Sequence, residues 1–211
     1  MPEAVIVKFY SPVSEASIGA LMKVVDQRLA AGVTQFTVLI STSGGSVFHG
    51  LTAYNYLKGI PAEVTTHNIG SVDSIGVALF CAGRVRLSVS QARFLMHPVS
   101  MNFREGASYE EPKLVELVKS LRVDMDNCAS VVAANTRKTR RQVFRAMLGR
   151  TTLDPDAALA LYRSAQEGVL LGRFHPFGDD LESEGPPDRS DGVDDRGAAD
   201  AVSEIFHETL V

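Results

Sequence analysis

Residues 36–47 read FTVLISTSGGSV, and this stretch decides the fold. The run at residues 36–40 is apolar and short, as in a strand that is buried on both faces of a sheet. Gly44 and Gly45 then allow a tight turn, and a helical pattern follows at residues 47–58. A buried strand that passes through a glycine turn into a helix predicts an α/β fold with a largely parallel sheet.

The flanking sequence repeats this alternation. Strand patterns at residues 4–10, 63–68, 85–89 and 93–96 alternate with helical patterns at residues 14–31, 74–82, 109–134 and 139–148. A last helix is expected to begin with Asp154 as its N-cap and Pro155 in its first turn. The longest helical pattern carries one apolar stripe, which we expect to be buried against another surface. The stripe consists of Leu114, Leu117, Val118, Leu121, Met125, Cys128 and Val132.

Length and composition predict one domain followed by a tail. The chain has 211 residues and is 45% hydrophobic, which is enough for one buried core. Of its 25 acidic and 21 basic side chains, residues 179–211 hold 11 acidic and 2 basic ones, so the rest of the chain is mildly basic. This last segment has few large apolar residues to offset the entropy of ordering it. We expect a domain over residues 1–178 and an acidic, disordered tail over residues 179–211.

Charge, cysteine content and hydropathy exclude several classes of protein. The basic body carries no nucleic-acid-binding motif, and its basic run RKTRR at residues 137–141 is typical of a solvated helix start. Cys81 and Cys128 have apolar neighbours and no ligand-like spacing. Neither a signal-peptide pattern nor an apolar segment of about 18 to 20 residues occurs. We expect a soluble, cytoplasmic protein that uses no metal or other cofactor and binds neither nucleic acid nor a membrane.

Three motifs carry groups suited to acyl transfer. In the motif GSVDSIG, Ser74 lies between a strand and the start of a helix, where the backbone N–H of Ile75 can face a developing oxyanion. The N–H of Gly45 in the glycine turn can supply a second donor. His97 ends the strand pattern FLM and is a candidate general base for Ser74. Taken singly, these features have ordinary structural explanations: a helix cap, a tight turn and a polar residue at a sheet edge.

Taken together, the motifs resemble the Clp-type (caseinolytic) protease proteolytic subunits. Those subunits carry an SPGGSV-like turn, a GxAASMG-like segment with the nucleophile and an MIHQP-like segment with the histidine. The corresponding segments here read STSGGSV, GSVDSIG and FLMHPV. The resemblance covers roughly residues 4–160 and implies a ClpP/crotonase-like fold with a protruding handle helix. It implies a serine-type endopeptidase with Ser74 as nucleophile, His97 as base, and the Gly45 and Ile75 amides as oxyanion donors.

One member of the family's catalytic triad has no counterpart in this sequence. The family's aspartate is expected shortly before the last helix, but residues 142–153 contain no carboxylate. Loss of that aspartate costs about 10⁴ in rate in a chymotrypsin-type triad. Asp154 and Asp156 are the nearest acids, and their position favours helix capping over catalysis. The group that orients His97 is therefore unknown, with the Thr151 hydroxyl or a water molecule as alternatives.

Two further departures from the family bear on pairing and partners. Asp73 stands where the family usually has a small apolar residue directly before the nucleophile. Because neighbours in sequence seldom face the same way, we expect Asp73 to pair with a base or a neighbouring subunit, not to replace the triad aspartate. The first strand begins at Ala4, and the family's N-terminal helix and axial loop have no counterpart before it. This weakens the case for an AAA+ unfoldase as partner.

Three functions are compatible with these residues. The first is a serine peptidase that acts on peptides or unfolded proteins and assembles into a homo-oligomeric ring, as the resemblance implies. The second is a catalytically weak or inactive ring subunit of the same fold. The third is a crotonase-type acyl-CoA enzyme, which shares the glycine-turn oxyanion hole but usually employs acidic residues as acid and base. The Ser74 and His97 pair favours the peptidase.

Overall fold

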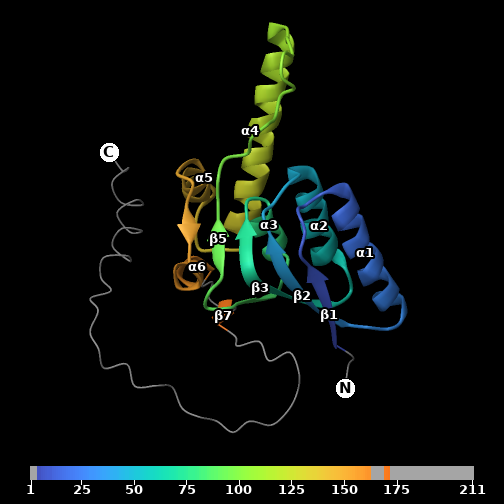
Figure 1. Ribbon diagram of the computed structural model, residues 1–211. Coiled ribbons are helices and arrows are strands. Elements are labelled where there is room, and N and C mark those ends of the chain that lie inside the picture. The colour runs from blue at the N-terminus through green and yellow to red at the C-terminus, as the bar shows by residue number, and fades with distance from the viewer. Residues whose placement is uncertain (1–3, 163–168, 172–211) are drawn as a thin grey trace, which may run out of the picture. The chain divides into compact units, whose positions relative to one another are not determined.

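The computed structural model describes residues 4–162 and 169–171 (Figure 1). Its strands are β1 (Ala4–Phe9), β2 (Gln35–Thr42), β3 (Glu63–Asp73), β4 (Val85–Ser88), β5 (Arg93–Leu95), β6 (Thr152–Leu153) and β7 (Val169–Leu171). Its helices are α1 (Glu15–Ala30), α2 (Val47–Gly59), α3 (Gly76–Phe80), α4 (Glu111–Ala134), α5 (Arg140–Leu148) and α6 (Pro155–Tyr162). The expected tail at residues 179–211 lies outside the described residues.

The strands form one mixed sheet that is mostly parallel, which confirms the expected fold class. Its main path runs β1-β2-β3-β4-β7, and every pair along this path is parallel. β5 pairs parallel with β3, and β6 pairs antiparallel with β5. Parallel strands end at the same edge of a sheet, so the loops that follow β2, β3 and β5 meet there.

β3 is longer than its sequence pattern predicted, and its two halves have different neighbours. Residues 65–68 pair with β4, whereas residues 71–73 pair with β5. The register with β2 shifts between Ile40 and Thr42, which lie beside the point where β3 changes partner. The expected end of this strand at Asn68 was wrong, because Gly70 and Ser71 interrupt the apolar pattern without ending the strand. As a result, the ends of β3 and β5 lie side by side.

The core fills the space between the sheet and helices α1, α2 and α3 (Figure 1). Its largest fully buried side chains include Phe36, Phe80, Phe94, Ile40, Leu57, Leu79, Val25, Val38 and Val72. Phe80 of α3 and Phe94 of β5 meet edge to face with 5.0 Å between ring centroids. The buried Thr66 hydroxyl donates to the Phe80 carbonyl (2.7 Å), which satisfies the end of α3. Packing thus fixes α3 against the strands that flank the candidate site.

Helix α4 extends away from the sheet, and only its C-terminal half is buried (Figure 1). Met125, Cys128 and Val132 are buried, but Leu114 and Val118 are 44% and 46% exposed. Within one chain, the expected burial of the apolar stripe is met only in its inner half, because no other described element of the chain reaches the outer half. None of the helices in the described part of the chain combines the length and apolarity needed to cross a membrane.

The packing of Phe94 leads to a test of the fold. Phe94 is 1% exposed, so Phe94→Ala is expected to lower the free energy of unfolding by about 3 to 5 kcal/mol through lost burial and the cavity it leaves. Phe48→Ala is the control, since Phe48 is 72% exposed, and should change stability by less than about 0.5 kcal/mol. Urea denaturation followed by circular dichroism measures both. Equal losses in the two variants would contradict the described core.

Candidate active site

Ser74 lies at the sharp turn between β3 and α3. Its φ of 59° is in the left-handed region that non-glycine residues rarely occupy, so the backbone is strained there. The Ser74 N–H donates to the Leu95 carbonyl of β5 (2.7 Å), and the Val77 N–H donates to the Ser74 carbonyl (3.0 Å). A serine on a strained strand-to-helix turn presents its hydroxyl above the end of the sheet, as a nucleophile requires.

The glycine turn after β2 packs directly against Ser74. Gly44 has a φ of 83°, and a Cβ at this position would lie 2.6 Å from the Ser74 Cβ, so no larger residue fits. The Val13 N–H donates to the Gly44 carbonyl (2.8 Å) and holds the turn in place. Within the described part of the chain, the N–H groups of Gly45 and Ile75 donate no hydrogen bond. Both donors remain available to an oxygen atom bound beside Ser74.

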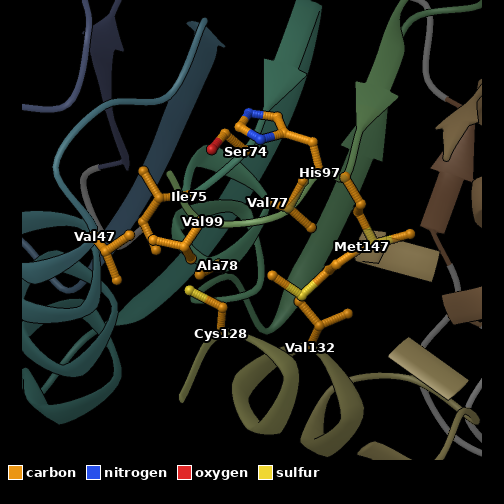
Figure 2. A pocket seen from close by; sticks show the side chains of 11 residues that line it. Val47, Ser74, Ile75, Val77, Ala78, His97, Val99, Cys128, Val132 and Met147 are labelled. Carbon is orange, nitrogen blue, oxygen red and sulfur yellow. The ribbon is translucent and has the colours of Figure 1, made fainter. Parts of the chain in front are cut away.

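His97 follows β5, and its ring faces the Ser74 hydroxyl at the mouth of a pocket (Figure 2). Its Nδ1 lies 2.7 Å from the carbonyl oxygen of Pro98. Because a carbonyl oxygen can only accept, Nδ1 carries the proton and Nε2 is left as an acceptor. A neutral imidazole in this tautomer can take a proton from a hydroxyl. The Pro98 carbonyl therefore fixes the tautomer, as the carboxylate does in a Ser-His-Asp triad.

An apolar pocket extends from Ser74 and His97 towards α4 (Figure 2). Its lining residues are Val47, Ser74, Ile75, Val77, Ala78, Met96, His97, Val99, Cys128, Val132 and Met147. Burial, with a smaller contribution from the charge of Asp124, raises the pKa of the Cys128 thiol to about 12. The thiol is therefore neutral near pH 7, and the floor of the pocket suits an uncharged, apolar group.

No carboxylate among the described residues forms a hydrogen bond with His97. β6 lies antiparallel to β5, and the Met96 N–H donates to the Thr151 carbonyl (2.9 Å). Arg150 directly precedes Thr151 in this bonded pair. Arg150 is exposed and has a φ of 55°, so it and Ser74 are the two non-glycine residues with positive φ in the described part of the chain. The segment that leads into β6 at residues 142–151 carries no carboxylate, and Arg150 is its last charged residue.

The other groups considered for orienting His97 are engaged elsewhere. The Thr151 hydroxyl donates to the Ala146 carbonyl (2.9 Å), and no hydrogen bond joins it to His97. The Asp154 carboxylate accepts a bond from the Ala157 N–H (2.7 Å), which confirms its expected role as the N-cap of α6. The sequence analysis missed the Pro98 carbonyl and Arg150. A backbone acceptor leaves no trace in residue type, and the place of Arg150 depends on the pairing of β5 with β6.

Comparison with known proteins decides the family. The family model described as Clp protease matches residues 5–161. The chain belongs to the Clp protease family. An ATP-dependent Clp protease proteolytic subunit 3 from Rhodococcus jostii is 40% identical over 63 residues, which are 29% of this chain and 31% of that protein. An ATP-dependent Clp protease proteolytic subunit from Huperzia lucidula is 24% identical over 149 residues, or 70% of this chain and 65% of that protein.

The matched regions span between about a third and two thirds of these relatives' lengths. A solved structure of a ClpP1 mutant from Listeria monocytogenes superposes with a TM-score of 0.68 at 18% identity, covering 80% of this chain and 92% of that one. The expected ClpP/crotonase-like fold and the resemblance to Clp proteolytic subunits are both confirmed.

The position of Arg150 leads to a gain-of-function prediction. Arg150→Asp would add a carboxylate next to Thr151, whose carbonyl is bonded to the residue before His97, and aspartate tolerates the left-handed backbone better than arginine does. We expect Ser74 to react with a fluorophosphonate at least about tenfold faster, a fraction of the roughly 10⁴ that an orienting aspartate contributes in chymotrypsin-type triads. Arg150→Asn is the control, since it relieves the same strain without adding a charge. Equal rates in the two variants would show that His97 does not use a carboxylate from this position.

Proposed function

We propose that this member of the Clp protease family is a serine peptidase that acts through Ser74 and His97. The observation that carries the proposal is the strained turn at Ser74 facing a histidine whose Nδ1 is tied to the Pro98 carbonyl at 2.7 Å. A serine that only caps a helix needs neither the strained φ nor a histidine partner. Family membership supports the same reaction, because the relatives are named as proteolytic subunits.

The proposed reaction proceeds in two halves. His97 Nε2 accepts the Ser74 proton as the Ser74 Oγ bonds to the carbonyl carbon of the peptide, and the N–H groups of Gly45 and Ile75 donate to the resulting oxyanion. The C–N bond then breaks, and the imidazolium Nε2–H donates its proton to the departing amine. Water, deprotonated by His97, attacks the acyl ester and releases the carboxylic acid and the Ser74 hydroxyl.

The pocket supports a preference for an apolar side chain on the acyl side of the cleaved bond. Its walls carry Val77, Val99 and Val132, and Cys128 on its floor is uncharged near pH 7. Placing an ionised side chain there would remove it from water without a partner. A peptide or an unfolded segment with an apolar residue before the scissile bond is therefore the proposed substrate.

The alternative of a weak or inactive subunit is supported by one observation. The described residues supply no carboxylate to His97, whose Nδ1 lies against the Pro98 carbonyl. A carbonyl group fixes the tautomer, but it stabilises the imidazolium less than a full negative charge does. We therefore propose a reactive centre with a modest turnover, for which acylation is the slow step.

The first test is modification of Ser74. A fluorophosphonate is expected to add one phosphonyl group to the wild-type protein, and Ser74→Ala should abolish the mass increase. His97→Ala should slow it by about 10³ or more, because the general base is lost. Intact-mass spectrometry reads both, with Ser90→Ala, a change of an exposed serine, as the matched control. No adduct on the folded wild-type protein would reject the peptidase, and hydrolysis of an acyl-CoA thioester would then favour the crotonase function.

We also propose that the outer half of α4 is a self-association surface. Leu114, Val115 and Val118 are 44%, 59% and 46% exposed, and such a row of apolar side chains on a protruding helix is typical of an interface. The relatives are named as subunits of an ATP-dependent protease, which supports an assembly of several copies and makes an AAA+ ATPase the first partner to test.

The apolar face of α4 gives a test of assembly. Val118→Asp is expected to convert an oligomer into monomers, because an unpaired carboxylate in an apolar interface costs several kcal/mol. Ser120→Asp adds the same charge on the opposite face of α4 and should leave the oligomer intact. Sedimentation velocity measures both. A wild-type monomer, or an oligomer that Val118→Asp leaves unchanged, would contradict the proposed surface.

A further inference from the structure

An ion pair with one buried partner joins the two strands that precede Ser74 and His97. Asp73 ends β3, and its side chain is 10% exposed; Arg93 begins β5, and its side chain is 55% exposed. The Arg93 Nη2 donates to one Asp73 oxygen at 2.8 Å. The Ser71 hydroxyl donates to the other Asp73 oxygen (2.7 Å) and accepts from Arg93 Nε (3.0 Å). The expectation that Asp73 pairs with a base is confirmed.

This cluster spans the register of β3 and β5. Ser71 pairs with Arg93, and Asp73 pairs with Leu95, so the ion pair runs diagonally across two steps of the ladder. Successive side chains alternate between the faces of a strand, so Arg93 and Asp73 meet on one face. The opposite face carries Val72 and Phe94, which are buried in the core. The two strands are therefore held together on both faces.

β5 needs such support because it is short. It has three residues, and its other neighbour, β6, has two. The Asn68 side chain also donates to the Arg93 carbonyl (2.9 Å), so Arg93 is tied to β3 through both its backbone and its guanidinium. A slip of one residue along a strand is about 3.3 Å, which would move His97 away from the position at which its ring faces Ser74.

We infer that Asp73 and Arg93 are positioning residues, which hold the ends of β3 and β5 in the register at which His97 faces Ser74. The inference rests on the proposed function and extends it, because neither side chain touches the substrate. The ion pair constrains His97 from the side of β3. On the side of β6, the described residues provide no carboxylate that could constrain it. Displacement of a catalytic group by about 1 Å can cost about 10² in rate.

Asp73→Ala is the decisive variant. It removes the buried carboxylate, while Arg93, more than half exposed, remains solvated, so the protein should stay folded with only a small fall in Tm. The rate of Ser74 modification by a fluorophosphonate is expected to fall about 10- to 100-fold, and kcat for a peptide ester should fall with it at unchanged KM. Arg93→Lys keeps the charge but loses the bond to Ser71. Its rate of Ser74 modification should lie between those of the wild type and Asp73→Ala.

Glu63→Ala is the matched control. The ion pair of Glu63 and Arg84 (2.6 Å) also involves β3, but it lies at the opposite end of that strand from Ser74, so its loss should leave the rate unchanged. A wild-type rate in Asp73→Ala, or a fall no larger than in Glu63→Ala, would overturn the inference while leaving the proposed function intact. If the wild-type protein is not modified at all, the proposed function fails. The His97 Cε1–H signal in NMR then decides, because Asp73→Ala should shift it and Glu63→Ala should not; an unmoved signal in both overturns the inference.

Discussion

The hydrogen bond from the Ser74 N–H to the Leu95 carbonyl, at 2.7 Å, joins the ends of β3 and β5 at the point where both strands enter their functional loops. It fixes the position of the Ser74 backbone, and β5 carries His97 two residues further on. The strained φ of 59° at Ser74 persists because this bond, the start of α3 and the packed glycine turn all restrain the same residue. The geometry of the site is thus set by the sheet and not by a flexible loop.

The close approach of backbone segments is the second constraint on the site. A Cβ on Gly50 of α2 would lie 2.2 Å from Ile75 Cγ1, and a Cβ on Gly45 would lie 2.2 Å from the Val13 carbonyl oxygen. Glycine at these two positions lets α2 and the turn after β2 press against the residues around Ser74. The two unbonded amides consequently belong to segments that are packed in place. Donors fixed before the substrate arrives need no rearrangement during the reaction, which is where an oxyanion site gains its effect.

The alternation of buried strands, glycine turns and helices was sufficient to predict the α/β class. The run at residues 36–40 is typical of a strand buried on both faces, and β2 occupies this place. The order of motifs also brought Ser74, His97, Gly45 and Ile75 to one edge of the sheet. Residue type alone does not show which strands pair with one another. The second half of β3 depends on its pairing with β5, and the Pro98 carbonyl beside His97 is a backbone group that residue type does not reveal. An apolar stripe predicts burial without identifying the burying surface, and within one chain only the inner half of α4 is covered.

Under the proposed mechanism, His97 keeps part of a triad's function without its carboxylate. A triad aspartate selects the tautomer, aims the ring and stabilises the imidazolium. The Pro98 carbonyl does the first, since it accepts from Nδ1 at 2.7 Å. The orientation of the ring then depends on the chain around it. The Val99 N–H donates to the Met125 sulfur of α4 (3.1 Å), and the Asp73–Arg93 pair joins β5 to β3. Stabilisation of the imidazolium needs a net negative charge, but the charge of Asp73 is already paired with Arg93. Formation of the imidazolium is therefore the step that this arrangement stabilises least. The protein should consequently react with an activated acyl group more readily than it cleaves an unactivated amide.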